Sequence, residues 1–503
     1  MTPASAAAAA QTLRATDPAD STAAFNAAID ALNHGLEPEG LELLEAARRL
    51  APRDPRLWQM AGLLHRNLDE FEAAIAMLGE AARLAPGDAL VAHTLARAHL
   101  EAGLPSIHLF QAARRLAPAN TDILEGLVAA VEEQVGPTAA IEMLEMVLGP
   151  NPTWLPGLET LMRLRWMCGD KLGFTADFDR ALAVDPSNIP VWRSLIIALT
   201  QANRYDEALE VVLRGRAAAG DHLIFDVNEA VARSELGQLA AAEPMFERLA
   251  AIEDGPLQVR RVRHFLRTGR PAEAAGLAER MTKTPNGMLF WPYLSIAWRQ
   301  TRDPRWEWLE GDPRFVGVYD LGLAGLDALA ERLRALHRTT HQPLEQSLRG
   351  GTQTQGNLFS RIDPEIRSLR AAIVAAVEAH VAQLPPPEAG HPLLDAPRES
   401  RVRFAGSWSV RLPGGGHHAN HIHPAGWFSS AFYVALPAEI PEPAGWLTLG
   451  VPQAELGIDL PPIRRIEPKP GRLILFPSTL WHGTVPFEAG ERLTVAFDVA
   501  RPF

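Results

Sequence analysis

The sequence predicts a chain of several domains, in which an all-α solenoid is followed by a mainly-β domain of jelly-roll type. The length of 503 residues is too great for one ordinary hydrophobic core. Residues 23–305 carry apolar residues at helical spacing, interrupted by short breaks with Pro, Gly, Asp or Asn. After residue 400 the pattern changes to short β-prone runs bounded by Gly and Pro, which is typical of a sandwich or barrel.

Composition narrows the class of protein. Hydrophobic residues make up 47% and charged residues 21%, as in globular proteins, and the formal net charge is -12. No basic block is visible, so we expect no nucleic-acid partner, and no apolar run is long enough to predict a membrane span. Residues 1–22 are interpreted as a low-complexity tail rather than a secretion signal. With one cysteine, Cys168, the chain cannot form an internal disulfide, and we expect a cytoplasmic location.

A repeat runs through the helical half. The phrases "RLAPRDP", "RLAPGDA", "RLAPANT", "LGPNPTW" and "AVDPSNI" recur, with prolines 34, 32, 32 and 36 residues apart at Pro52, Pro86, Pro118, Pro150 and Pro186. Proline cannot supply a backbone donor, so each of these prolines is expected to follow the end of a helix. A period of this length predicts stacked helix pairs.

The repeat resembles the tetratricopeptide repeat. Counted from Trp58, small residues fall on Gly62 and Ala74, which would let two antiparallel helices approach closely, and Pro86 ends the second helix. The resemblance implies a curved solenoid over residues 23–305, with a concave groove suited to a protein or peptide ligand. Nothing in the sequence names that ligand.

The rest of the chain, residues 306–503, is expected to form a second domain with a core at 400–503. Helical spacing resumes over residues 321–337 and 366–384, and a polar, glycine-containing stretch lies between them at 341–359. The runs "GWFSSAFYVALP", "GRLILFPSTLWHGTVPF" and "RLTVAFDVARP" predict strands. The helices would support the sheets.

A group of histidines lies near the carboxy terminus. If the backbone at 421–423 is extended, His421 and His423 face the same side, because strand side chains alternate. A later strand carries His482 and is expected to bring it to the same place. Imidazole nitrogens suit Fe(II), so the three histidines are candidate metal ligands and catalytic residues.

A candidate anion clamp follows ten residues after His482. Arg492 and Thr494 share one face of the strand "RLTVAF". A guanidinium with a neighbouring hydroxyl is a good receptor for a carboxylate. A dicarboxylic keto acid could therefore reach the metal at one end and Arg492 at the other.

Residues 341–503 resemble the iron(II)/2-oxoglutarate-dependent oxygenases, and in particular a group carried behind tetratricopeptide repeats. The resemblance rests on "QSLRGGTQT", "HIHPAGWFSSAFYV", "PGRLILFPSTLWHGTVPF" and "RLTVAFD". It implies a double-stranded β-helix, Fe(II), 2-oxoglutarate and dioxygen. His421 and His482 match the iron ligands of the family, whereas Arg492 and Thr494 match the residues that bind the distal carboxylate of 2-oxoglutarate.

One position departs from the pattern of the wider superfamily, which has an acidic residue where this chain has His423. Three interpretations stay open: iron has three histidine ligands, His423 stands off the metal, or His418 contributes instead. Asp498 is expected to lie too far away to replace the acid, because it follows Arg492 by six strand residues, a separation of roughly 20 Å.

The leading hypothesis is a dioxygenase that hydroxylates a protein, a peptide or a small molecule recruited by the repeats. One alternative is a non-catalytic scaffold with a degenerate, cupin-like barrel. Another is a metalloenzyme with three histidine ligands and no keto acid, in which Arg492 would have no role in turnover.

Overall fold

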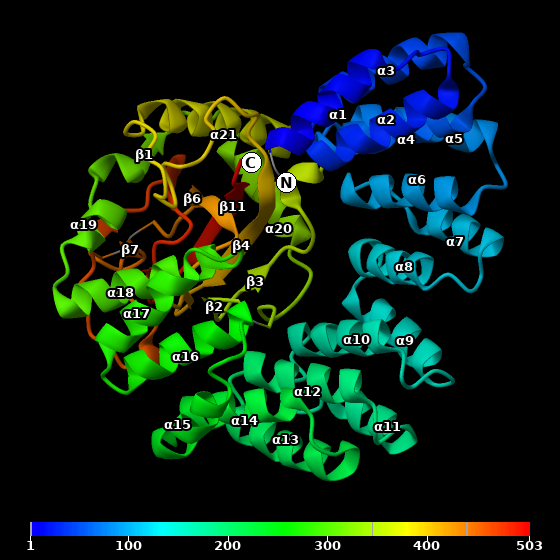
Figure 1. The fold of residues 1–503 in the computed structure, drawn as a ribbon. Helices are drawn as coiled ribbons and strands as arrows, with labels where there is room; N and C mark the ends of the chain where they lie inside the picture. The colour runs from blue at the N-terminus through cyan, green and yellow to red at the C-terminus, as the bar shows by residue number, and fades with distance from the viewer. Residues whose placement is uncertain (1–2, 345, 439–440, 503) are drawn as a thin grey trace. The chain divides into compact units, whose positions relative to one another are not determined.

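The computed structural model describes residues 3–344, 346–438 and 441–502. The chain divides into two compact units. Figure 1 shows their helices and strands, coloured from the amino to the carboxy terminus. One runs up to Ala140 and also contains Gln355–Ala371, and the other contains Ile141–Thr354 and Ala372–Pro502. Of the helices in these ranges, none combines the length and the hydrophobicity needed to cross a bilayer.

The first unit consists of helices that follow one another in sequence. They are α1 (Pro3–Ala15), α2 (Ser21–His34), α3 (Glu37–Leu50), α4 (Pro55–Asn67), α5 (Phe71–Leu84), α6 (Ala89–Glu101), α7 (Ile107–Leu116) and α8 (Thr121–Gln134). Residues 3–15 of the expected tail form α1, whose Leu13 packs with Ala27 and Ala31 of α2. α9 (Pro137–Leu148) begins in this unit and ends in the other.

The repeated phrases are the turns between helix pairs. α3, α5 and α7 each end two residues before the repeat proline, as predicted. Two residues beyond that proline, Asp54, Asp88 and Asn120 accept hydrogen bonds from backbone N–H groups of the next helix. These side chains satisfy donors that a helix amino terminus leaves unpaired. Each phrase therefore ends one helix and starts the next.

The predicted close approach of α4 and α5 is confirmed at Gly62. A Cβ atom at this position would lie 2.6 Å from Cγ of Leu78 and 3.1 Å from the backbone oxygen of Ala74. Both atoms belong to a tightly packed interface, because Leu78 and Ala74 are fully buried. Glycine is therefore required here by contact between the helices.

We expect Gly62→Ala to lower the free energy of unfolding by about 1–3 kcal/mol, the usual cost of overpacking. Gly79→Ala in α5 is the matched control, because a Cβ atom there meets nothing within 4 Å. That change should stabilise the chain by about 0.5–1 kcal/mol, since alanine favours helix more than glycine does. Thermal unfolding followed by circular dichroism measures both. Similar shifts for the two variants would contradict the close approach.

The second unit joins further helices to all of the strands. Before the first strand lie α10 (Leu155–Met167), α11 (Ala176–Val184), α12 (Ile189–Gln201), α13 (Tyr205–Ala219), α14 (Leu223–Glu235), α15 (Leu239–Arg248), α16 (Gly255–Arg267), α17 (Pro271–Met281), α18 (Trp291–Thr301) and α19 (Arg305–Glu310). α20 (Leu326–Leu336) and α21 (Pro364–Gln383) confirm the two helices predicted after residue 320, although α21 starts in the first unit.

The strands form antiparallel sheets, as predicted for the carboxy-terminal domain. The six-stranded sheet has the order β1-β9-β6-β11-β4-β3, and smaller sheets pair β10-β7-β8 and β2-β5. The bounds are β1 (Gly317–Asp320), β2 (Leu348–Arg349), β3 (Thr352–Gln353), β4 (Phe404–Pro413), β5 (His417–His418), β6 (Gly426–Ala435), β7 (Leu447–Leu449), β8 (Arg464–Ile466), β9 (Arg472–Pro477), β10 (His482–Thr484) and β11 (Glu491–Ala500). Apolar residues of β6, β7 and β9 share one core cluster, so the six-stranded and three-stranded sheets pack together.

Helices α16 to α19 share a hydrophobic core with the strand region. One buried cluster contains residues of these helices together with Leu456 and Trp481. The indole Nε1 of Trp481 donates to the carbonyl of Pro292 at 2.9 Å, and Arg299 donates to the carbonyl of Pro461 at 2.6 Å. The boundary between the two compact units therefore does not lie at residue 305. The expected limits of the domains stay predictions.

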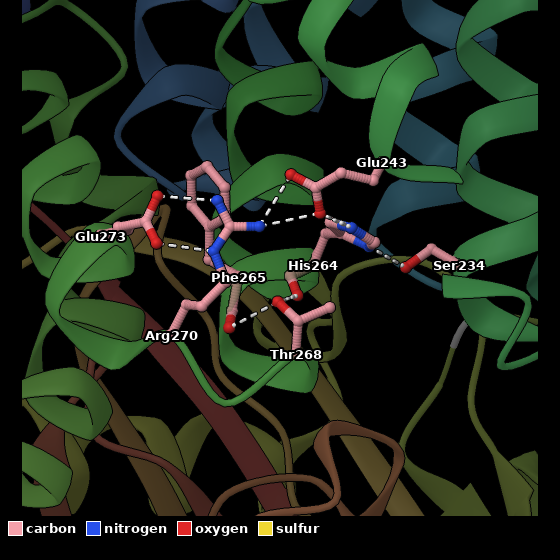
Figure 2. A network of polar contacts seen from close by, with 7 residues as sticks. All are labelled: Ser234, Glu243, His264, Phe265, Thr268, Arg270 and Glu273. Carbon is pink, nitrogen blue, oxygen red and sulfur yellow. Dashed lines mark hydrogen bonds and ion pairs between the residues drawn. The ribbon is translucent and has the colours of Figure 1, made fainter. Parts of the chain in front are cut away.

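A polar network ties α14, α15, α16 and α17 together (Figure 2). His264 of α16 lies 2.9 Å from the hydroxyl of Ser234 and 3.0 Å from the carboxylate of Glu243. Arg270 donates to Glu243 at 2.7 Å and to Glu273 at 2.6 Å. The order serine, histidine, acid resembles a catalytic triad, but Ser234 and His264 are 4% and 1% exposed. A substrate could not reach that serine, so the network is structural.

Candidate metal centre

The three predicted histidines meet where two chain segments form a backbone bridge. His421 and His482 exchange backbone hydrogen bonds of 2.8 and 3.0 Å, which places their imidazole centroids 4.1 Å apart. His423 lies two residues further on, with its ring 4.8 Å from that of His421 and 5.3 Å from that of His482. One ligand atom from each ring lies within 4.8 Å of the others. A single ion could contact all three.

Hydrogen bonds fix the tautomer of each ring. Nδ1 of His421 lies 2.9 Å from the carbonyl of Ala419, and Nδ1 of His482 lies 2.9 Å from the carbonyl of Leu480. A carbonyl oxygen only accepts, so each Nδ1 carries the proton and each Nε2 keeps its lone pair. Burial, and then the neighbouring imidazoles, hold the pKa of His421 and His482 well below the usual value. Both rings are therefore neutral at neutral pH, and each could offer Nε2 to a metal ion.

Asp498 is the acceptor for the third ring, because its Oδ2 lies 2.8 Å from Nδ1 of His423. It lies nearer to this histidine than its separation from Arg492 along the strand suggested, but outside the group of three histidines that could hold one ion. The distance along β11 was counted from Arg492. However, the cavity runs along the strand, and alternating residues from Arg492 to Asp498 all line it. Arg492 and Asp498 lie toward opposite ends of one face of β11, and both line the same cavity.

Ser347 is a residue of the site that the sequence did not single out. Its hydroxyl lies 3.1 Å from Nε2 of His421 and 3.0 Å from Nδ1 of His418. The pairing of β2 with β5 brings this polar segment beside the histidines. Nε2 of His421 can accept this hydrogen bond or bind a metal ion, but not both at once. A bound ion would therefore displace the hydroxyl of Ser347.

Arg492 and Thr494 line the same cavity as the histidines. The Arg492 side chain is buried and donates to the carbonyl of Gly445 at 3.2 Å, and its Cζ lies 5.0 Å above the ring of Tyr433. Among the described residues, neither Nε of Arg492 nor the hydroxyl of Tyr433 has a hydrogen-bond partner. Burial lowers the pKa of the guanidinium and raises the pKa of the phenol.

A buried cation with an unused donor is costly unless an anion pairs with it. Arg492 forms no ion pair with a carboxylate within the described ranges, although buried arginines elsewhere in the chain, such as Arg263, do. The part of the cavity lined by Arg492 and Thr494 therefore fits a carboxylate. Tyr433 could have been found from its sequence, because it shares a strand face with Ser429 and Ala431.

The other candidate residues divide between the cavity and its supports. His418 lines the cavity, and burial lowers its pKa well below the usual value, but it lies outside the group of three histidines that could hold an ion. Arg349 donates to the carbonyls of Gln346 and Leu348, which is a structural role within its own loop. Gly414–Gly416 form the turn between β4 and β5.

The tryptophans around the site have different roles. Trp408 lines the cavity and stacks on His423, with centroids 5.7 Å apart and planes 13° from parallel. Trp427 and Trp481 are buried and donate their indole N–H groups to the carbonyls of Leu393 and Pro292. Of these three tryptophans, Trp408 alone lines the cavity.

Comparison with known proteins finds a family model that matches part of the carboxy-terminal region. Residues 406–498 match a family model described as "Putative 2OG-Fe(II) oxygenase". The matched segment includes the three histidines, Arg492 and Asp498. No curated protein matches the chain.

The helical region is similar to solved repeat proteins. A tetratricopeptide repeat protein from Parabacteroides merdae is 17% identical, with a TM-score of 0.33, and the match covers 55% of this chain and 97% of that one. MamA from Desulfovibrio magneticus is 18% identical, with a TM-score of 0.30, and the match covers 35% of this chain and 98% of that one. The chain thus joins a helical region to a segment similar to 2-oxoglutarate/Fe(II) oxygenases.

Proposed function

We propose that the chain is an iron(II)/2-oxoglutarate-dependent dioxygenase. The observation that carries this proposal is the presence, in one cavity, of three convergent imidazoles and a buried arginine that has no acidic partner among the described residues. His421, His423 and His482 would hold Fe(II) through Nε2. Arg492, with Thr494, would hold the distal carboxylate of 2-oxoglutarate.

Each part of the site has a separate role in this reaction. Bound Fe(II) with 2-oxoglutarate supplies oxidative decarboxylation, which converts the keto acid to succinate and carbon dioxide while dioxygen hydroxylates the substrate. Arg492 sets the direction of the keto acid, and the buried walls exclude water. Trp408 holds the His423 ring from one side and borders the space left for substrate.

The substrate is proposed to be a protein or peptide recruited by the helical repeats, with a small molecule as the alternative. The helical region supports this, since such solenoids present long surfaces to extended ligands. A non-catalytic scaffold is less well supported. A degenerate site has no need of a buried, unpaired Arg492, whose burial lowers stability unless an anion binds.

The test is turnover by the purified full-length chain. With Fe(II), 2-oxoglutarate and dioxygen, we expect succinate formation that requires all three, and a rate that rises when a true substrate is added. Succinate is measured by mass spectrometry, and a chelator is the control. If the chain binds neither Fe(II) nor 2-oxoglutarate, the scaffold function replaces this one.

A further inference from the structure

We propose that Asp498 is a positioning residue for His423 and that it supplies, through this ring, the negative charge that a set of three neutral imidazoles lacks. The inference rests on the proposed metal centre and assigns a role to a residue outside its ligand set. Asp498 would then belong to the metal site although its carboxylate would not contact the ion.

The first observation is the geometry of the carboxylate. Oδ2 of Asp498 lies 2.8 Å from Nδ1 of His423, and Oδ1 lies 2.6 Å from the hydroxyl of Ser429. Ser429 and Asp498 are register partners on β6 and β11, so the contact is built into the sheet. The Asp498 side chain is 13% exposed. Both oxygens are therefore fixed, and little water competes for them.

The hydroxyl of Ser429 has a second neighbour, Ser478, at 3.0 Å. A hydroxyl has one hydrogen and a carboxylate only accepts, so Ser429 donates to Asp498 and accepts from Ser478. Oδ1 of Asp498 thus accepts from Ser429, which leaves Oδ2 to accept from Nδ1 of His423. Nδ1 then carries the proton of the neutral ring, which leaves Nε2 free for the ion.

The second observation is the contrast among the three rings. His421 and His482 donate to neutral main-chain carbonyls, whereas His423 donates to a carboxylate. A charge-assisted hydrogen bond is stronger than a neutral one, and it makes the imidazole a better electron donor to a metal. Trp408 stacks on the same ring. His423 is thus held by a charge at its edge and a ring on its face.

The test is metal affinity without turnover. Co(II) is titrated into the metal-free, full-length protein under anaerobic conditions, without 2-oxoglutarate, and binding is followed by visible absorption. We expect Asp498→Ala to weaken Co(II) binding by about 10- to 100-fold, the usual cost of losing such a partner. The nearly isosteric Asp498→Asn keeps an acceptor for Nδ1 without the charge, so it should bind with intermediate affinity.

Asp320→Asn is the matched control, because this aspartate pairs with Arg472 at the far edge of the six-stranded sheet. It should bind Co(II) like the wild type, and thermal unfolding checks that each variant is folded. If Asp498→Ala fails to fold, Asp498→Asn decides. Wild-type affinity in both Asp498 variants overturns the inference and leaves the metal centre standing, and wild-type affinity in Asp498→Asn alone overturns its charge component.

A failure of the proposed function would look different. The wild type would then bind Co(II) no better than a variant that lacks His482, whatever residue stands at position 498. This comparison separates the failure of the metal centre from the failure of the role of Asp498.

Discussion

Replacement of His482 by alanine should abolish metal binding and turnover together. His482 is 6% exposed, and its ring lies closest to that of His421. Loss of this imidazole removes one of three ligand atoms and leaves water in its place. The expected loss of Co(II) affinity therefore exceeds the roughly 10- to 100-fold that loss of an outer hydrogen-bond partner costs.

The matched control is His417→Ala, which removes a nearby histidine that does not line the cavity. It should bind Co(II) and form succinate like the wild type. Because His482 packs 4.6 Å from the ring of Phe476, its loss also leaves a cavity, and unfolding must be measured beside binding. A folded His482→Ala variant with wild-type affinity for Co(II) would contradict the metal centre.

Replacement of Arg492 by methionine should separate the metal from the keto acid. We expect the concentration of 2-oxoglutarate needed for half-maximal turnover to rise by about 30-fold or more, since the loss of one partner from a buried charge pair costs about 2 kcal/mol or more. Co(II) affinity should stay unchanged, because Arg492 donates to the carbonyl of Gly445 and touches none of the three ligand rings. Titration with 2-oxoglutarate measures the first effect.

The same substitution should have the opposite effect on stability. In the ligand-free protein Arg492 is a buried cation with no acidic partner in the part of the chain that the structure describes, so methionine should raise the melting temperature. Arg411→Ala is the control, since this arginine lies on β4 and pairs with Glu491 outside the cavity. An unchanged 2-oxoglutarate requirement in Arg492→Met would favour a three-histidine metalloenzyme that uses no keto acid.

Much of the fold could be predicted because it follows from local patterns. Proline spacing located the helix ends, and alternation along strands placed Arg492 and Thr494 on one cavity face. Alternation also predicted that His421 and His423 face the same side of the chain. These features depend on periods of a few residues, which a sequence displays directly.

The rest of the site depends on contacts between distant segments. Ser347 reaches His421 only because β2 pairs with β5, two strands of two residues each. Asp498 reaches His423 across a register that no local pattern contains. The separation from Arg492 along β11 does not predict this contact, because His423 belongs to a different segment of the chain. Strand alternation applied from Arg492 to the end of β11 would have placed Asp498 on the correct face.

The core that α16 to α19 share with Leu456 and Trp481 has a consequence for how this protein could change over time. A repeat solenoid is usually modular, so units can be gained or exchanged with little effect on their neighbours. Here the last helices carry the carbonyl of Pro292 that receives the indole N–H of Trp481, next to a metal-site histidine. Sequence change in the earlier helices is therefore less constrained, whereas change in the last ones would also disturb the core around Trp481.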